Sequence, residues 1–500
     1  MLGFVDITCI PKSEFITTLS KFFNNDDDDD FSNLKFLVPS QLNTLLERLK
    51  DNIWFITERP YVDKHYRDTY YAFHSSKFYK IGRNCIRVHL FEGEVAENDL
   101  FDLTNALNER YRGFFIIRPL MHHILGRSLI SPEAFKTNNF FCCLTKGRVS
   151  LLGRNLSVYG FPHIAQDEET HTCAESALWC HIEYYGSKYP QYKSLLPSKI
   201  VKTLLDSPDH RILPSIGLTN NELTKCLNDN GFQCLIYDTD SGDNKKTFFQ
   251  LLKIYVESGI PLLLFISNKK EAHAVLVIGH EKDESVHDVQ STWIDTSSIE
   301  KKMVFIDDNM PPYQMASLSE PTDHYENEMN DMEIVSFIVA LPVHVYLVAE
   351  KAYDLMYTIF EDEQIGLQTF NGKWISRLLL TGSQSFKNFI LNDDNNNIMP
   401  DEIKQPLLSL SLPKFIWMCE LYKAENFNPD DGYCSGLLLI DPTTNGKSLT
   451  PILFYAIGDK LLEHDCEAWK GFENIVEFKM PTYKNNLKGE WSKWQSGMTG

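Results

Sequence analysis

The sequence predicts an α+β fold in which a helix packs against an antiparallel sheet. The helix is indicated by apolar residues at 3–4 spacing that follow Cys173 and stop near Gly186. The strands are indicated by apolar runs at Ser258–Ile266, Glu271–Gly279 and Met303–Asn309, of which the first begins with a turn. A long helical element followed by strands of this kind is typical of a helix packed on one sheet.

Composition indicates a globular protein. Hydrophobic residues make up 43% of the chain and aromatic residues 12%, which excludes global disorder. The net charge of −20 argues against binding to nucleic acid or an anionic membrane, so basic or neutral partners are expected. The amino terminus lacks the basic start and long apolar stretch of a signal peptide.

Two further features favour a cytoplasmic protein. The longest apolar window, Ile334–Ala349, has sixteen residues and contains Pro342 and His344. It is shorter than the roughly 20 residues that cross a bilayer, and we interpret it as buried strands. The chain has eleven cysteines without the spacing of a disulfide framework, which indicates free thiols in a reducing compartment.

Cys173 is the candidate nucleophile, because the predicted helix starts with it. A thiol in the first turn of a helix faces unpaired backbone N–H groups and the positive end of the helix dipole. Both favour the thiolate over the thiol. A thiolate alone does little, so a base, a residue that orients the base and a donor to the developing oxyanion are also required.

Candidates for these roles occur on both sides of Cys173. His273 begins a predicted strand, which would hold the imidazole rigidly as a base. Asp307 directly ends the next apolar strand and would fix the tautomer of His273, while Asp308 is the alternative and points the other way on an extended chain. Gln166, seven residues before the thiol, would donate its side-chain amide to an oxyanion beside the backbone N–H of Cys173.

A zinc site is the competing interpretation of the same region. The sequence has no Cys-x-x-Cys pair and no His-Glu-x-x-His, and Cys173 and Cys180 are nearly two helical turns apart. We therefore expect no metal and no cofactor. The metal-ligating residue types that cluster here are His163, His171, Cys173, Cys180 and His181.

The region from Phe161 to Tyr313, about a third of the chain, resembles the papain-like cysteine peptidase superfamily, and most closely its branch of bacteriocin-leader peptidases. The resemblance implies a papain-like core, in which a catalytic N-terminal helix packs on an antiparallel sheet, and a Cys-His-Asp triad with a Gln oxyanion donor. The sequence differs from the family in having Cys173-Ala174-Glu175 in place of Cys-Gly-Pro or Cys-Gly-Ser, and Asp307-Asp308 in place of Asp-Pro. The matching motifs are Gln166, Cys173, Tyr184-Tyr185-Gly186, Gly217-Leu218-Thr219, His273-Ala274-Val275 and Asp307.

These residues predict a cysteine-dependent hydrolase, a peptidase or isopeptidase that acts on a polypeptide or another amide-bearing substrate. An acyltransferase or transglutaminase-like enzyme on the same scaffold remains an alternative, because an acyl-thioester also reacts with amines. A second alternative is an inactive papain-like module that binds proteins. The sequence does not indicate the oligomeric state.

Three domains are predicted: an N-terminal α+β domain at 1–150, the peptidase-like domain at 151–350 and a C-terminal α+β domain at 351–500. The first contains a run of acidic residues at 24–30, which we interpret as a solvated loop. It also contains an alternating run at Ile86–Phe91, which predicts a strand with Arg87 and His89 pointing outward.

Overall fold

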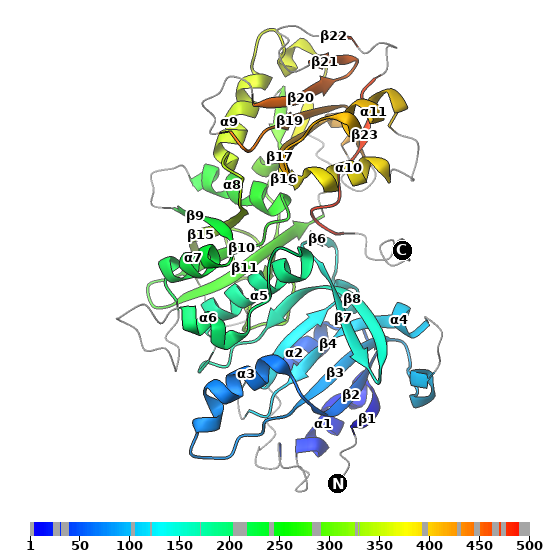
Figure 1. Ribbon diagram of the computed structural model, residues 1–500, viewed down its shortest axis with the longest axis vertical. Helices are drawn as coiled ribbons and strands as arrows, with labels where there is room; N and C mark the ends of the chain where they lie inside the picture. Colours follow the sequence, from blue (N-terminus) through cyan, green and yellow to red (C-terminus); the bar gives the residue numbers. More distant parts are fainter. Residues whose placement is uncertain are drawn as a thin grey trace.

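Three β-sheets follow one another along the long axis of the molecule, and helices pack beside each of them (Figure 1). This architecture is that of a computed structural model of the 500-residue chain. None of the helices in its described residues has the length and apolar composition needed to cross a membrane. The acidic run at 24–30 lies outside the described residues. The structure describes residues 5–23, 31, 40–101, 106–120, 123–170, 172–203, 218–239, 245–282, 292–325, 329, 331–392, 399–427, 432–444, 451–462, 470–471 and 477–489.

The first sheet is antiparallel, with the strand order β1-β2-β3-β4-β5-β8-β7. Its inner face is buried against apolar side chains of two amphipathic helices, such as Phe15 of α1 and Leu42 of α2. The strands are β1 (Asp6–Pro11), β2 (Ile53–Tyr61), β3 (Cys85–Glu92), β4 (Tyr111–Ile117), β5 (Leu125–Ile130), β7 (Thr145–Leu151) and β8 (Arg154–Ile164). The helices of this part are α1 (Phe15–Phe23), α2 (Ser40–Arg48), α3 (Lys64–Ala72) and α4 (Ala106–Arg110).

The predicted outward orientation of Arg87 and His89 on β3 is wrong, because both side chains are buried. A second apolar cluster, which includes residues of α3 and α4, covers that face of the sheet. Glu58 compensates both buried groups, since its carboxylate accepts a hydrogen bond from Arg87 Nε and lies 2.9 Å from His89 Nε2. Alternation of residue types therefore identified the strand but not the second buried face.

The second sheet has the strand order β14-β13-β11-β10-β15-β9, and β6 adds a further antiparallel pair with β11. Leu276 shares an apolar cluster with Leu178 of α5, whereas Val275 shares another with Leu252 of α8. Because successive side chains of a strand point to opposite faces, α5 and α8 cover opposite faces of this sheet. Its strands are β6 (Phe140–Cys142), β9 (Phe232–Asp238), β10 (Leu262–Ser267), β11 (Ala272–Glu281), β13 (Met303–Ile306), β14 (Gln314–Ala316) and β15 (Glu333–Pro342). Its helices are α5 (Cys173–Lys188), α6 (Pro197–Thr203), α7 (Asn220–Asp229) and α8 (Lys245–Glu257).

Helix α5 begins at Cys173, as predicted, but it does not end at Gly186. The helix continues to Lys188, and Gly186 lies in its last turn. A Cβ atom at Gly186 would be 2.7 Å from the backbone nitrogen of Ser194, so the glycine permits a close approach of the following loop. The apolar window Ile334–Ala349, interpreted as buried strands, contains a single strand, β15, followed by a turn region that leads into α9 (Ala349–Phe360).

The third sheet has the strand order β12-β16-β17-β19-β20-β21-β22 and is antiparallel except for the parallel pair β12–β16. Its strands are β12 (Trp293–Asp295), β16 (Trp374–Gly382), β17 (Phe415–Lys423), β19 (Gly436–Ile440), β20 (Ile452–Ile457), β21 (Lys460–Leu462) and β22 (Lys470–Gly471). The helices here are α9 (Ala349–Phe360), α10 (Ser383–Leu391) and α11 (Asp401–Ser409). A separate two-stranded sheet pairs β18 (Tyr433–Cys434) with β23 (Met480–Pro481). Short 3-10 helices lie at Lys12–Glu14, His74–Ser76, Glu97–Phe101, Pro132–Ala134, Thr296–Ser298, Leu367–Thr369 and Ala424–Asn426.

The chain is a mixed α/β protein with largely antiparallel sheets, in agreement with the predicted class. Its strands cross the predicted domain boundaries: β8 belongs to the first sheet, β6 to the second and β12 to the third. The boundary at 150/151 falls inside β7. Each of the strands β6, β8 and β12 pairs in a sheet that lies mainly in a neighbouring predicted domain. The division into three domains stays a prediction.

Candidate functional site

Cys173 is the first residue of α5, and its side chain is partly exposed. The residue before it, Thr172, caps the helix. The Thr172 backbone N–H donates to the Glu175 carboxylate at 3.2 Å, and the Thr172 hydroxyl donates to the same group. The first helical hydrogen bond runs from the Ser176 N–H to the Thr172 carbonyl at 3.0 Å. The contacts between Thr172 and Glu175 fix the start of the helix and therefore keep the thiol in its first turn.

His273 and Asp307 form a buried pair beside this helix. His273 lies near the start of β11, and its Nε2 is 3.0 Å from Oδ1 of Asp307, which follows β13 directly. The two strands are hydrogen-bonded neighbours, so the sheet itself brings the two side chains together. Because Nε2 faces the carboxylate, Nδ1 is the ring nitrogen left for the thiol.

The electrostatics of the pair favour an imidazolium and a carboxylate. Burial alone lowers the pKa of His273, but the charge of Asp307 and its hydrogen bond outweigh this and hold the pKa well above the usual value. The interaction with the Cys173 side chain raises the pKa of His273 further. Burial raises the pKa of Asp307, but the opposing charge of His273 brings it far below its usual value.

Asp308, the alternative acid, occupies a different environment. Its Oδ1 is 3.7 Å from His273 Nε2, beyond hydrogen-bonding distance, and neither carboxylate oxygen has a hydrogen-bond partner. Burial raises the pKa of Asp308 to about 7; the charge of His273 opposes this shift and that of Asp307 adds to it. The two adjacent carboxyl groups therefore differ: the surroundings favour the ionised form of Asp307 and the protonated form of Asp308.

Gln166 lies in the loop between β8 and α5 and is partly exposed. Its side-chain Nε2 donates to Oδ1 of Asn309. The backbone N–H of Asn309 in turn donates to Oδ1 of Asp307 at 3.0 Å. A chain of hydrogen bonds thus connects the loop before the thiol to the carboxylate beside the histidine.

Three further residues hold Asp307: sequence reasoning missed Tyr325 and His324, and it considered His163 only as a metal ligand. The Tyr325 hydroxyl donates to Oδ2 at 2.6 Å, and His324 Nε2 is 3.3 Å from the same oxygen. Burial, together with the charge of Asp307, raises the pKa of Tyr325, so the hydroxyl keeps the proton that it donates. His163 Nε2 lies 3.1 Å from the backbone carbonyl of Asp307. The sequence signal for this contact was the adjacent pair His324 and Tyr325 in an otherwise acidic loop. The loop has no apolar periodicity, so its position relative to Asp307 could not be predicted.

The same residues include types that can also ligate a metal ion. Within the described part of the chain, the group of potential ligands whose atoms lie within 4.8 Å of one another is His273, Asp307 and Asp308. Both oxygens of Asp307 already accept hydrogen bonds, so this group fits an oriented acid better than a set of metal ligands.

The zinc candidates from the sequence do not assemble among the described residues. His163 contacts Ser128 Oγ at 3.3 Å through its other ring nitrogen. His181 packs against Tyr185 and Phe232, and burial lowers its pKa to about 3. His171 lies outside the described residues.

Comparison with known proteins gave limited similarity, to solved structures alone. No protein-family model matches the chain, and no curated protein matches it. Among solved structures, the chain is similar to the peptidase domain of Streptococcus ComA, described as a bifunctional ABC transporter involved in a quorum-sensing pathway. The two are 14% identical with a TM-score of 0.21, and the match covers 36% of this chain and 98% of that domain. A TM-score this low does not establish a shared fold or function. The chemistry proposed below therefore rests on the geometry of this chain.

Proposed function

We propose that this protein is a cysteine-dependent hydrolase, a peptidase or isopeptidase that acts on a polypeptide or another amide-bearing substrate. The observation that carries the proposal is the buried His273–Asp307 pair beside the thiol at the start of α5. Three segments far apart in the sequence contribute one group each. A nucleophile, a base and a residue that orients the base are the parts that thiol catalysis requires.

The proposed reaction proceeds through an acyl-thioester. The Cys173 thiolate attacks the substrate carbonyl, and the Gln166 amide and the Cys173 backbone N–H stabilise the oxyanion. The C–N bond then breaks, and the His273 imidazolium gives its proton to the leaving amine. Water, deprotonated by His273, hydrolyses the thioester and regenerates the thiol. Asp307 orients His273 and offsets its positive charge throughout.

The proposed core is papain-like. This part of the proposal is supported by α5 packing on one face of the sheet whose strands β11 and β13 carry His273 and Asp307. It agrees with the motif resemblance from Gln166 to Asp307. In this scheme the first and third sheets flank the core.

Two other partly exposed cysteines provide internal controls for a test of Cys173. Burial raises the pKa of Cys9, and Glu97 and Asp99 raise it further, while burial raises the pKa of Cys234 to about 12. Both thiols are therefore protonated and slow to react near neutral pH.

The test is alkylation of the full chain with iodoacetamide at about pH 6, followed by peptide mass spectrometry. We expect Cys173 to react at least about tenfold faster than Cys9 and Cys234, and His273→Ala to remove the difference. Equal, slow labelling of all three thiols would reject the enzyme and favour a protein-binding module.

A second assay separates hydrolysis from acyl transfer. The full chain is acylated with 4-nitrophenyl acetate in the presence and absence of an added primary amine. We expect acetate as the product in both cases. Faster turnover with incorporation of the amine would show instead that the acyl-thioester is passed to an amine acceptor.

A further inference from the structure

Asn309 contacts both arms of the candidate site. Its backbone N–H donates to Oδ1 of Asp307 at 3.0 Å, which is the oxygen that also faces His273. Its side-chain Oδ1 accepts a hydrogen bond from Nε2 of Gln166. Asn309 is only partly buried, so a substitution of its side chain leaves the core of the sheet intact.

The backbone of Gln166 is held from the other side by Arg118, which follows β4 of the first sheet. Arg118 Nη2 donates to the carbonyls of Gln166 at 3.1 Å and Ala165 at 3.4 Å. It also donates to the carbonyl of His123 at 2.6 Å. Arg118 is buried, and the three carbonyls converge on its Nη2 group, so the guanidinium holds this stretch of backbone in place.

These contacts limit the orientations of the Gln166 amide. A primary amide has two N–H groups, and Asn309 occupies one of them. With the backbone held by Arg118 and one N–H bound to Asn309, few orientations of the amide remain. The second N–H is then available in a defined direction without loss of rotamer freedom during the reaction.

We propose that Asn309 is a positioning residue that orients Gln166 as the oxyanion donor and links this donor to the Asp307 arm. The proposal rests on the proposed function. Asn309 acts through Gln166 and does not itself touch the substrate. The Asn309 side chain also contacts Tyr325, but Asn309→Ala keeps the backbone N–H and the Tyr325 hydroxyl on Asp307. We therefore expect removal of the Asn309 side chain to impair the steps that form a tetrahedral oxyanion.

Two reactions of the same thiol separate this role from a general structural role. Acylation by 4-nitrophenyl acetate forms an S–C bond at the ester carbonyl, passes through an oxyanion and releases 4-nitrophenolate. Alkylation by iodoacetamide displaces iodide at a saturated carbon and forms no oxyanion. Both reactions need the Cys173 thiolate, but only acylation needs an oxyanion donor.

The experiment compares the full-length wild type with Asn309→Ala, Gln166→Ala and the double variant. Asn230→Ala is the matched control, because Asn230 is also partly buried and its side chain donates to a backbone carbonyl, that of Cys226, at 2.7 Å. We expect acylation to fall about tenfold in Asn309→Ala and about a hundredfold in Gln166→Ala, with no further fall in the double variant. Alkylation of Cys173 stays within about twofold in all of them, and Asn230→Ala matches the wild type in both reactions.

Three results would overturn the role of Asn309: unchanged acylation in Asn309→Ala, an equal fall in alkylation, or losses that multiply in the double variant. Failure of the proposed function looks different. In that case wild-type Cys173 is neither alkylated nor acylated faster than Cys9 and Cys234.

Discussion

Strand β11 carries two buried histidine–carboxylate pairs, and the difference between them indicates what makes one of them a candidate active site. His273 Nε2 is 3.0 Å from Asp307 near the start of the strand, and His280 Nε2 is 3.0 Å from Glu257 near its end. Both histidine side chains are 4% exposed. Distance and burial therefore do not distinguish the pairs. The difference lies in the residues that surround each pair.

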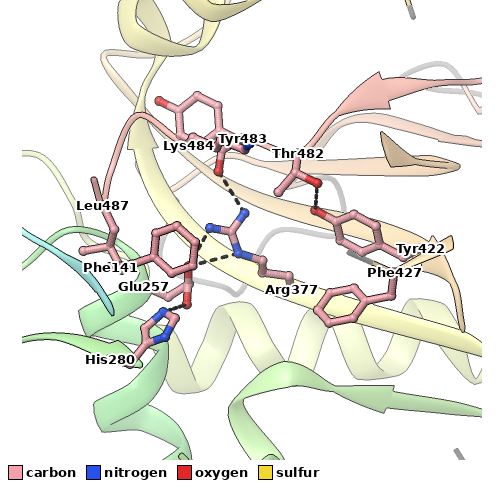
Figure 2. Close-up of a pocket in the computed structure, with 10 residues that line it drawn as sticks. All are labelled: Phe141, Glu257, His280, Arg377, Tyr422, Phe427, Thr482, Tyr483, Lys484 and Leu487. Carbon is pink, nitrogen blue, oxygen red and sulfur yellow. Dashed lines mark hydrogen bonds and ion pairs between the residues drawn. The ribbon is translucent and has the colours of Figure 1, made fainter. Parts of the chain in front are cut away.

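The second pair belongs to a network of opposite charges that joins the second sheet to the third. Arg377 of β16 donates to Glu257 at 2.5 Å and to the Tyr483 carbonyl at 3.0 Å (Figure 2). It also donates to Glu420 of β17 at 2.6 Å. Burial raises the pKa of Glu257, but the charge of Arg377 brings it well below its usual value. The cavity there has a volume of about 30 Å³, room for a water molecule, and no cysteine lines it.

A guanidinium thus satisfies the carboxylate of the second pair, whereas the imidazole is the principal cation beside Asp307. The first pair also has a thiol next to it. We infer that the imidazolium of the first pair can donate its proton in a reaction, while the second pair has a structural role.

The largest expected difference between the pairs is in thiol reactivity. Replacement of His273 by Ala removes the base, so acylation of Cys173 by 4-nitrophenyl acetate should fall by about 10²–10⁴-fold. His280→Ala should leave acylation within about twofold, because His280 faces Glu257 and not the thiol. Stopped-flow release of 4-nitrophenolate measures both variants. Similar losses in the two would contradict the assignment of separate roles.

The second network should dominate stability. Arg377→Met leaves Glu257 and Glu420 as buried carboxyl groups without their shared cation, which should lower the free energy of unfolding by about 3–5 kcal/mol. Lys351→Met is the control, because it breaks the exposed ion pair with Asp354 and should change stability by less than about 1 kcal/mol. Urea unfolding followed by tryptophan fluorescence gives both values. A decrease in the free energy of unfolding as small as that of the control would mean that the network does not stabilise the contact between the second and third sheets.

Local patterns predicted the elements of the site better than its contacts. The helix at Cys173 and the strands with His273 and Asp307 follow from apolar periodicity, because each element buries one face or both. The motif resemblance placed Gln166 and Asp307 in one site, and the structure brings both near the segment that ends in Asn309.

Contacts between distant segments were not predictable in the same way. His324 and Tyr325 reach Asp307 from a polar loop, and nothing in a loop without period indicates which carboxylate it covers. The same limit explains Arg87 and His89, whose partner Glu58 lies on the neighbouring strand. Polar side chains are buried where a partner is available, and a single strand does not reveal the partner.

The last expected difference is in the sign of the pH dependence of stability. Burial raises the pKa of Asp308 from 3.8 to about 7, so between about pH 4 and pH 7 the folded protein keeps a proton that the unfolded chain has released. The free energy of unfolding therefore falls as the pH rises through this range. Above about pH 7 the full destabilisation by the buried charge of Asp308 is present. Asp308→Asn has no charge to bury and should be more stable than the wild type at pH 8 by about 1–3 kcal/mol, with little difference at pH 4.5.

Glu257 should behave in the opposite way, because its folded pKa lies below the usual value. It stabilises the folded protein above that usual value and loses this contribution as the pH falls, so Glu257→Gln should be less stable than the wild type at pH 8. Thermal unfolding of the two variants and the wild type at pH 4.5 and pH 8 measures both signs. Destabilisation of Asp308→Asn at pH 8 would mean that a cationic partner holds Asp308 as an anion, as Arg377 holds Glu257. The thiol beside His273 would then be the one remaining difference between the two histidine–carboxylate pairs.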